Sequence, residues 1–109
     1  MDGVPEPHNG WTFLTNHARV LASIAVDRTS RIRDIAARCR LTERAVQKII
    51  SDLEHEGYLV RTREGRSNTY RIQPDTPLRH PAEASLSVSE LLALLARHDA
   101  ERGSRQPRP

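Results

Sequence analysis

Apolar residues recur every three or four positions along several segments of this chain, and this spacing predicts amphipathic helices. The clearest segment is 43–54, where one apolar stripe falls at positions i, i+3, i+4 and i+7. The stripe consists of Val46, Ile49, Ile50 and Leu53. Thr42 stands directly before this segment, where its hydroxyl can accept a hydrogen bond from a nearby backbone amide and cap the helix. We predict that the helix buries its stripe and exposes the opposite, polar side.

Two shorter helices are expected upstream of this one. The first covers about residues 15–26, where apolar positions repeat at helical spacing and Thr15 or Asn16 can cap the start. The second covers residues 33–39 and precedes the striped helix by a short turn. Between the two, Arg31-Ile32 predicts a brief strand that pairs with a later hairpin.

Downstream, the period of the pattern changes from helical to alternating. Residues 58–63 and 68–72 are rich in β-favouring and alternating side chains, which predicts two strands. Gly57 stands where a left-handed residue is needed to stop the preceding helix. Gly65 supplies the backbone freedom for a loop of three to five residues between the strands. The order is therefore helix, turn, helix and hairpin.

A last helix is expected at 87–98, because Ser87 and Glu90 form a capping-box pattern in which each can satisfy the other's free amide. Its apolar positions are Val88, Leu91, Leu92, Leu94 and Leu95. An apolar face of this kind needs a covering surface. The first helix of the same chain is one candidate, and a second copy of the chain is the interpretation that we favour. Paired helices of this kind would set the distance between two copies of the upstream helices.

These elements predict a mainly α fold with a small β-hairpin, an α+β fold within one small domain. The expected division of the chain is a flexible N-terminus at 1–10, an ordered domain at 11–73, a Pro-rich linker at 74–86, the C-terminal dimerisation helix at 87–98 and a disordered tail at 99–109. Trp11 and Phe13 are expected to pack in the core or at the N-terminus, with a place in a small-molecule pocket at a dimer interface as the alternative.

Composition bears on where the protein is located, and charge is distributed unevenly along the chain. The chain is 37% hydrophobic and 28% charged, and no run approaches the roughly 18 apolar residues of a membrane span. Its start lacks a signal-peptide pattern, so we expect a cytoplasmic protein. Residues 31–71 hold ten basic and six acidic side chains, net +4, whereas the rest of the chain is net −1. Positive charge on the helix and hairpin segment favours attraction to phosphate.

Other chemistries find little support in the sequence. The five histidines lack a metal-ligand spacing, and no Gly-rich phosphate loop, nucleophile elbow or paired-Cys motif is present. Cys39, the single cysteine, is expected to be a small buried residue, and a redox-sensing thiol is the alternative. We predict no enzyme, no metal and no cofactor.

The second helix of a helix-turn-helix enters the DNA major groove, where side chains near its start reach base edges. Arginine can pair with guanine and glutamine with adenine, so Arg44, Gln47, Lys48 and Ser51 are candidate readers. The hairpin adds candidates for contact with phosphates or the minor groove. The full set of candidate DNA-contacting residues is Thr42, Glu43, Arg44, Gln47, Lys48, Ser51, Arg63, Arg66 and Asn68. The alternative is that these are ordinary solvated side chains.

Residues 35–59 resemble the "IAxxxxIsxxxVxxxIxxLexxGYL" pattern of bacterial winged helix-turn-helix transcriptional regulators, and the similarity is greatest to small MarR-like or ArsR-like proteins. The passage from Leu53 through Gly57-Tyr58-Leu59 into a basic wing is its most specific part. The resemblance implies a dimeric regulator that binds operator DNA, with residues 42–51 in the major groove and Arg66 at the wing tip.

The chain also departs from that pattern. Arg40 stands where the pattern usually has Gly, which predicts an arginine in a strained or altered turn at a cost of about 1 kcal/mol. The metal-binding cysteines of metal-sensing relatives are missing, and no small-molecule effector is identified. A winged helix that binds another protein without specific DNA binding is the alternative function.

Overall fold

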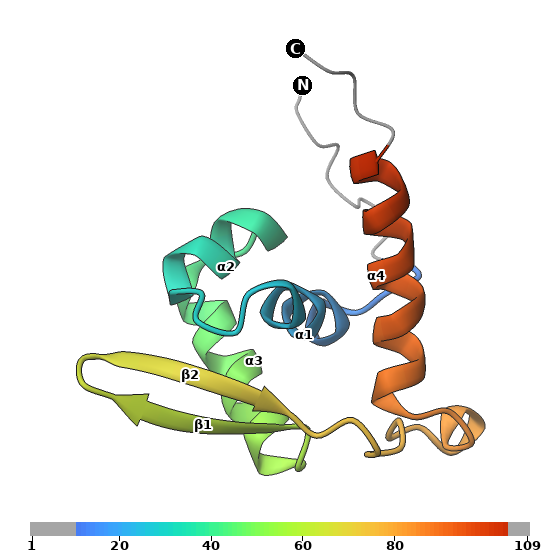
Figure 1. Ribbon diagram of the computed structural model, residues 1–109. Helices are drawn as coiled ribbons and strands as arrows, with labels where there is room; N and C mark the ends of the chain where they lie inside the picture. Colours follow the sequence, from blue (N-terminus) through green and yellow to red (C-terminus); the bar gives the residue numbers. More distant parts are fainter. Residues whose placement is uncertain (1–10, 105–109) are drawn as a thin grey trace.

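A computed structural model describes residues 11–104 of the chain and the side chains of residues 11–96. The elements, in chain order, are α1 (Asn16–Val26), α2 (Ile32–Cys39), α3 (Glu43–His55), β1 (Leu59–Glu64), β2 (Ser67–Ile72), the 3₁₀ turn η1 (Pro81–Glu83) and α4 (Val88–Ser104) (Figure 1). The two strands are antiparallel neighbours in one small sheet. The predicted α+β fold with a single hairpin is therefore confirmed.

Threonine hydroxyls start two of the helices, as the sequence indicates. Thr15 Oγ1 accepts a hydrogen bond from the Ala18 amide at 3.1 Å, and Thr42 Oγ1 accepts one from the Ala45 amide at 3.0 Å. Each hydroxyl satisfies an amide that has no partner within the helix. Both predicted caps are confirmed, with Thr15 and not Asn16 as the cap of α1.

The core lies where α1, α2 and α3 meet the base of the hairpin. The α3 stripe is buried as predicted, and the hairpin contributes Leu59 and Tyr70. The buried apolar residues are Val20, Leu21, Ile24, Ile35, Ala36, Val46, Ile49, Ile50, Leu53, Tyr58, Leu59, Tyr70 and Val88. Burying a large aliphatic side chain contributes about 1.5–3 kcal/mol. These contacts fix how α3 and the hairpin sit relative to each other.

The turns on either side of α3 use the same hydrogen-bond pattern with different residues. After α3, the Tyr58 amide donates to the Leu53 carbonyl at 2.9 Å and Gly57 has a φ of 86°. After α2, the Leu41 amide donates to the Ala36 carbonyl at 2.9 Å and Arg40 has a φ of 58°. Both are helix ends closed by a left-handed residue. The expected strain at Arg40 is confirmed, because side chains disfavour this region.

The hairpin turn is shorter than the sequence indicates. Glu64 pairs with Ser67, so only Gly65 and Arg66 lie in the loop, and the expected loop of three to five residues is wrong. Gly65 has a φ of 64°, and Arg66 has no positive φ. This is the sign pattern of a type II′ turn, whose twist matches that of the flanking strands. The two strands therefore stay paired up to Glu64 and Ser67, directly beside the turn.

The predicted strand at Arg31-Ile32 is also wrong. Ile32 begins α2, and the residues before it form a compact turn in which Asp27 Oδ1 accepts from the Thr29 amide at 3.0 Å. The link to the sheet is a single hydrogen bond from the Tyr70 amide to the Arg28 carbonyl, at 3.1 Å. The side-chain hydrogen bonds of the turn compete with an extended conformation, which explains the difference.

The C-terminal region has more structure than expected. Between the hairpin and α4, residues 74–86 contain η1, and Pro77 pairs with Ser87 in an isolated bridge. The capping box is confirmed, since the Ser87 amide donates to Glu90 Oε1 at 2.8 Å and the Glu90 amide donates to Ser87 Oγ at 3.3 Å.

Helix α4 continues to Ser104, so the predicted end at 98 and the disordered tail from 99 are wrong over this stretch. Ala100, Glu101 and Arg102 in this stretch favour helix, and the helix ends at Gly103-Ser104, which favour it less. The predicted flexible N-terminus at 1–10 and the last residues of the tail, 105–109, lie outside the described residues. No helix in the described part of the chain is both long and apolar enough to cross a bilayer.

Candidate nucleic-acid interface

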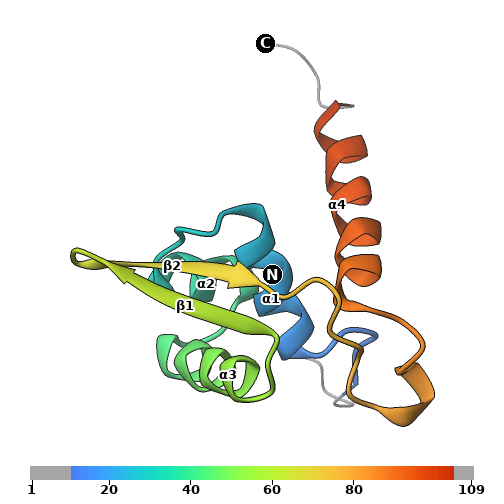
Figure 2. The same ribbon diagram turned by 60° about the horizontal axis from the view of Figure 1, so that its bottom comes forward.

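Helix α3 and the hairpin share one end of the molecule, and α4 occupies the other. Figure 2 shows α3 beside the hairpin, while α4 rises from the opposite end, beyond α1; the same separation is visible in Figure 1. Most of the candidate DNA-contacting residues lie on α3 and the hairpin. The fold therefore brings them to one end, away from the leucines of α4.

The polar side of α3 is fully presented to solvent. Its exposed members are Glu43, Arg44, Gln47, Lys48 and Ser51, all predicted. The apolar stripe on the other side anchors the helix in the core. The position of the exposed face therefore does not depend on its polar side chains. Thr42 differs from the rest, because its hydroxyl is engaged as the helix cap. Thr42 thus helps to fix the start of α3, and its hydroxyl is already engaged within the chain.

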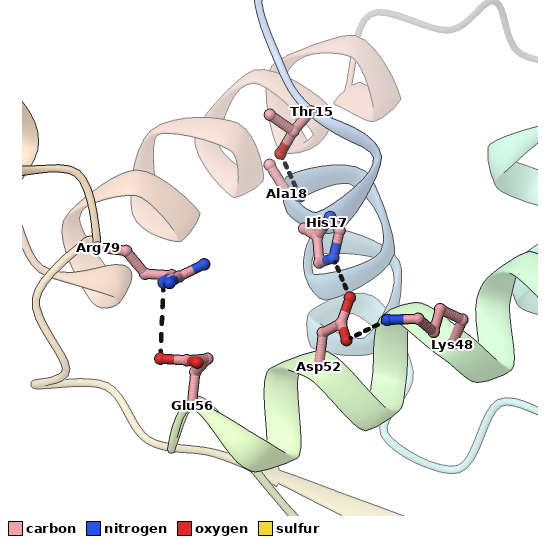
Figure 3. A network of polar contacts seen from close by, with 7 residues as sticks. All are labelled: Thr15, His17, Ala18, Lys48, Asp52, Glu56 and Arg79. Carbon is pink, nitrogen blue, oxygen red and sulfur yellow. Dashed lines mark hydrogen bonds and ion pairs between the residues drawn. The ribbon is translucent and has the colours of Figure 1, made fainter.

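Lys48 is not a free cation, which the sequence did not show. Its Nζ lies 2.8 Å from Asp52 Oδ1, and His17 Nε2 lies 2.8 Å from Asp52 Oδ2 (Figure 3). Hydrogen bonds from Lys48 and His17 hold the pKa of the Asp52 carboxyl below its usual value. The Lys48–Asp52 spacing of i, i+4 is visible in the sequence, but the link to α1, 35 residues away, is not.

The hairpin presents a second set of cations on a defined face. Strand register pairs Arg61 with Tyr70 and Arg63 with Asn68, so these four side chains share the face that is buried at its base. Arg63 Nε donates to the Gly65 carbonyl oxygen at 3.2 Å. Arg66 is exposed at the tip of the hairpin. The predicted residues Arg63, Arg66 and Asn68 therefore gather at the outer half of the hairpin.

Arg61 takes part in a contact that the sequence reasoning missed. Its Nε lies 3.1 Å from Glu54 Oε2 and its Nη2 lies 2.9 Å from Glu54 Oε1. This two-point pairing joins β1 to the last turns of α3. Arg61 is exposed on the strand but its guanidinium is engaged within the chain.

Arg38 is a further arginine whose charge is used internally. Its guanidinium donates to the Ser23 carbonyl at 3.2 Å and to Ser30 Oγ at 2.5 Å, which ties α2 to α1 and to the turn between them. Cys39 beside it is half-buried against the core, and burial raises the pKa of its thiol. A raised pKa suppresses the reactive thiolate, so the packing role of Cys39 fits better than redox sensing.

A groove of about 650 Å³ opens at the other end, between the start of α1, the end of α3 and the loop that leads to α4. Phe13, Leu86 and Leu91 are among its apolar lining residues. Phe13 is 92% exposed and Trp11 67% exposed, so neither packs in the core, and of the two expected arrangements only packing at the N-terminus is found. They contact each other edge-to-face at 5.3 Å. Of these two aromatic residues, only Phe13 lines the groove.

Val88 differs from the other residues of α4 that were predicted to form a dimer contact. It is fully buried in the core of its own chain, so it is unavailable to a second copy, and its expected role in dimerisation is corrected. Leu92 is half-buried against the same core, whereas Leu94 is 55% exposed. Among the described side chains, no three His, Cys, Asp or Glu come close enough to hold a metal ion.

Three helices followed by a basic hairpin define a winged helix-turn-helix protein. No protein-family model matches the sequence, and no curated protein matches it. Several solved structures share the fold. MepR from Staphylococcus aureus, a transcription regulator of the multidrug efflux pump MepA, matches 85% of this chain and 65% of its own, with a TM-score of 0.53 and 14% identity.

Two MarR-family proteins are similar to the same degree. SPO1453 from Silicibacter pomeroyi matches 82% of this chain and 59% of its own, with a TM-score of 0.53 and 18% identity. ZitR from Lactococcus lactis, a zinc-responsive member, matches 93% of this chain and 63% of its own, with a TM-score of 0.53 and 14% identity. The chain spans about three fifths of the length of these proteins. It has the winged-helix fold of MarR-family regulators.

Proposed function

We propose that the protein is a sequence-specific transcriptional regulator that binds double-stranded DNA. The observation that carries this proposal is the α3 surface: a rigidly anchored helix with Arg44, Gln47 and Lys48 on its exposed side, beside a hairpin that ends in Arg66. The fold shared with MarR-family regulators supports the same function. We expect no catalytic activity.

In this proposal α3 enters the major groove. The groove is about 12 Å wide and admits a helix with its side chains. Arg44 and Gln47 lie in the first two turns of α3, where base edges are closest in helix-turn-helix complexes. A good bidentate contact to a base contributes about 1–3 kcal/mol of discrimination. Lys48 and Ser51 lie further along the same face and complete the contact.

The hairpin acts as the wing, on the DNA backbone or in the minor groove. Arg66 at its tip and Arg63 beside it supply positive charge, and Asn68 adds an amide on the same face as Arg63. Such contacts strengthen binding and fix the register of the protein on DNA, while α3 supplies the sequence preference.

The proposed assembly is a homodimer held by α4. Leu91, Leu94 and Leu95 remain as the main contact residues, because Val88 is buried within its own chain and Leu92 is half-buried against the same core. Leu94 in α4 and Leu86 in the loop before it are exposed large apolar side chains of the kind found at protein interfaces. Two-fold symmetry then predicts a palindromic site with half-sites about 34–36 Å apart.

The exposed apolar residues also favour the alternative function, a winged helix that binds another protein. A triple variant separates the two: Arg44→Ala, Lys48→Ala and Arg66→Ala together remove three cations of the DNA-facing surface. Arg79→Ala is the control, since Arg79 is 69% exposed but lies in the loop before α4.

The measurement is the dissociation constant for duplex DNA at several salt concentrations. We expect the logarithm of the dissociation constant to rise more than three times as much in the triple variant as in Arg79→Ala. The salt dependence of binding should also be flatter in the triple variant. If the triple variant binds duplex DNA like the wild type, the proposed surface does not contact DNA, and the protein-binding alternative gains support.

A further inference from the structure

The pairing of Arg61 with Glu54 is the one polar side-chain link between the described hairpin and α3. Both guanidinium–carboxylate distances, 3.1 Å and 2.9 Å, are within hydrogen-bonding range. The arrangement is bidentate, which fixes direction as well as distance. The Glu54 side chain is 27% exposed and that of Arg61 42% exposed, so the pair is partly shielded from water.

The pair sits at the level where the hairpin leaves the body of the protein. Leu59 and Tyr70 are buried at the base, and all β1 residues after Leu59 are exposed. On the opposite strand, the Tyr70 amide donates to the Arg28 carbonyl at 3.1 Å. Because Arg61 and Tyr70 are register partners, one rung ties both strands to the helical body.

Beyond this rung the described hairpin residues bond only to one another. Arg63 bonds to Gly65, and Thr69 bonds to Glu64 at 3.3 Å. A two-stranded hairpin is marginally stable without support from other elements. The angle between the outer hairpin and α3 therefore depends on the rung that contains Arg61.

We propose that Glu54 and Arg61 are positioning residues that set the angle of the wing against α3 and so decide where Arg63 and Arg66 meet the DNA. This inference rests on the proposed function. The tip lies about five residues beyond Arg61, or about 13–17 Å at about 3.4 Å per residue. A tilt of about 15° at that rung moves the tip by about 4 Å, more than a hydrogen bond tolerates.

Arg61 has a competing role that predicts different results, namely direct contact with a phosphate. A phosphate-binding arginine contributes to the salt dependence of binding, and its loss lowers the slope by about one. A positioning arginine acts through Glu54, so exchanging the two charges preserves its role. Glu54→Arg combined with Arg61→Glu keeps the net charge of the wild type, which removes non-specific charge effects.

The experiment compares wild type, Arg61→Gln, Glu54→Gln and the exchanged pair. Dissociation constants and hydroxyl-radical footprints are measured on a duplex selected by the wild type, and melting temperatures verify folding. We expect each single variant to lose protection at the wing-contacted backbone while protection around α3 persists, with about 5- to 10-fold weaker binding for Arg61→Gln. The exchanged pair should recover the wing protection.

Two results would overturn the proposal. The first is an intact wing footprint in Arg61→Gln. The second is a loss of binding and wing protection in Arg61→Gln that the exchanged pair does not recover, as direct phosphate contact by Arg61 requires.

A DNA-free readout separates this proposal from the proposed function. Backbone amide relaxation of residues 61–71 should show a more mobile hairpin in Arg61→Gln than in the wild type or the exchanged pair. If the wild type binds no duplex but the hairpin loosens as expected, the proposed function fails and, of this proposal, only the role of Glu54 and Arg61 in holding the hairpin against α3 stands. If the hairpin amides are unchanged in Arg61→Gln, the positioning role fails whatever the DNA result.

Discussion

The two ends of the molecule expose surfaces of opposite character. At the α3 end, charged and amide side chains stand outside an apolar stripe that is buried almost completely. At the α4 end, Phe13, Leu86 and Leu94 are themselves exposed. Exposed charge is well hydrated and needs no partner to be stable, whereas exposed apolar area costs about 25 cal/mol for each Å² left in water. The α3 surface thus suits a reversible anionic ligand, and the α4 surface suits a permanent protein contact.

The largest expected effect comes from adding charge to the apolar end. Leu94→Asp places a carboxylate in the proposed α4 contact, while Leu94 itself is 55% exposed and outside the core, so the monomer should remain folded. We expect light scattering to show a shift from dimer to monomer. Affinity for a duplex with two half-sites should fall on the order of 100-fold, because two linked contacts become independent.

Ala93→Asp is the matched control for this prediction. Ala93 is exposed and adjacent to Leu94 but lies off the leucine face of α4. The two variants have the same added charge and should differ in assembly. Equal masses for Leu94→Asp and the wild type in light scattering would contradict the α4 dimer.

Two single substitutions sharpen the roles within the charged surface. Arg44→Ala should cost about 1–3 kcal/mol and relax the base preference at one position of the site, because a base contact is lost. Arg66→Ala should weaken binding to all sequences about equally and lower the salt slope by about one. Quantitative binding to a set of single-base operator variants distinguishes them. A uniform loss for Arg44→Ala would show that Arg44 contacts phosphate.

The two turns around α3 predict opposite changes in stability. Arg40 and Gly57 both have a positive φ, but only glycine adopts it without strain. Arg40→Gly should raise the free energy of unfolding by about 1 kcal/mol, and Gly57→Ala should lower it by about 1 kcal/mol. No atom lies within 4 Å of a methyl group built on Gly57, so that loss reflects the backbone alone. Denaturant midpoints for both variants provide the measurement; shifts of the same sign would refute the comparison.

The smallest expected effect concerns pH and Asp52. Its pKa in the folded chain lies below the model-peptide value of 3.8, so the carboxylate is favoured by folding. That stabilisation is present above pH 3.8 and is lost as the pH falls through the lower, folded pKa. Asp52→Asn should remove this part of the acid dependence, measured by thermal melting across pH 2–5. An unchanged acid dependence in the variant would show that Asp52 does not contribute to it.

The features that local sequence determines were predicted well. The α3 stripe, the Thr42 cap, the Gly57 stop and the capping box at Ser87 and Glu90 each depend on side chains within a few residues of one another. Their geometry follows from helical spacing and from the hydrogen bonds that a helix end needs. The strain at Arg40 was expected from the resemblance, because the family pattern usually has Gly at that position.

The features that distant contacts determine were missed. The bridge from His17 to Asp52 and the burial of Val88 in its own core depend on how helices pack, which no spacing reveals. The expected strand at Arg31-Ile32 was lost to the turn that Asp27 organises. The DNA-contacting role of the candidate residues stays a prediction, since the fold shows their surface but not its ligand.

The central claim is that α3 and the wing recognise a specific duplex sequence. Its most direct test is selection of bound molecules from a pool of random duplex DNA, with sequencing at two salt concentrations. We predict recovery of a two-fold symmetric motif, with half-sites about one helical turn apart, that persists at the higher salt. Enrichment of no motif, with binding that disappears as salt rises, would contradict sequence-specific recognition.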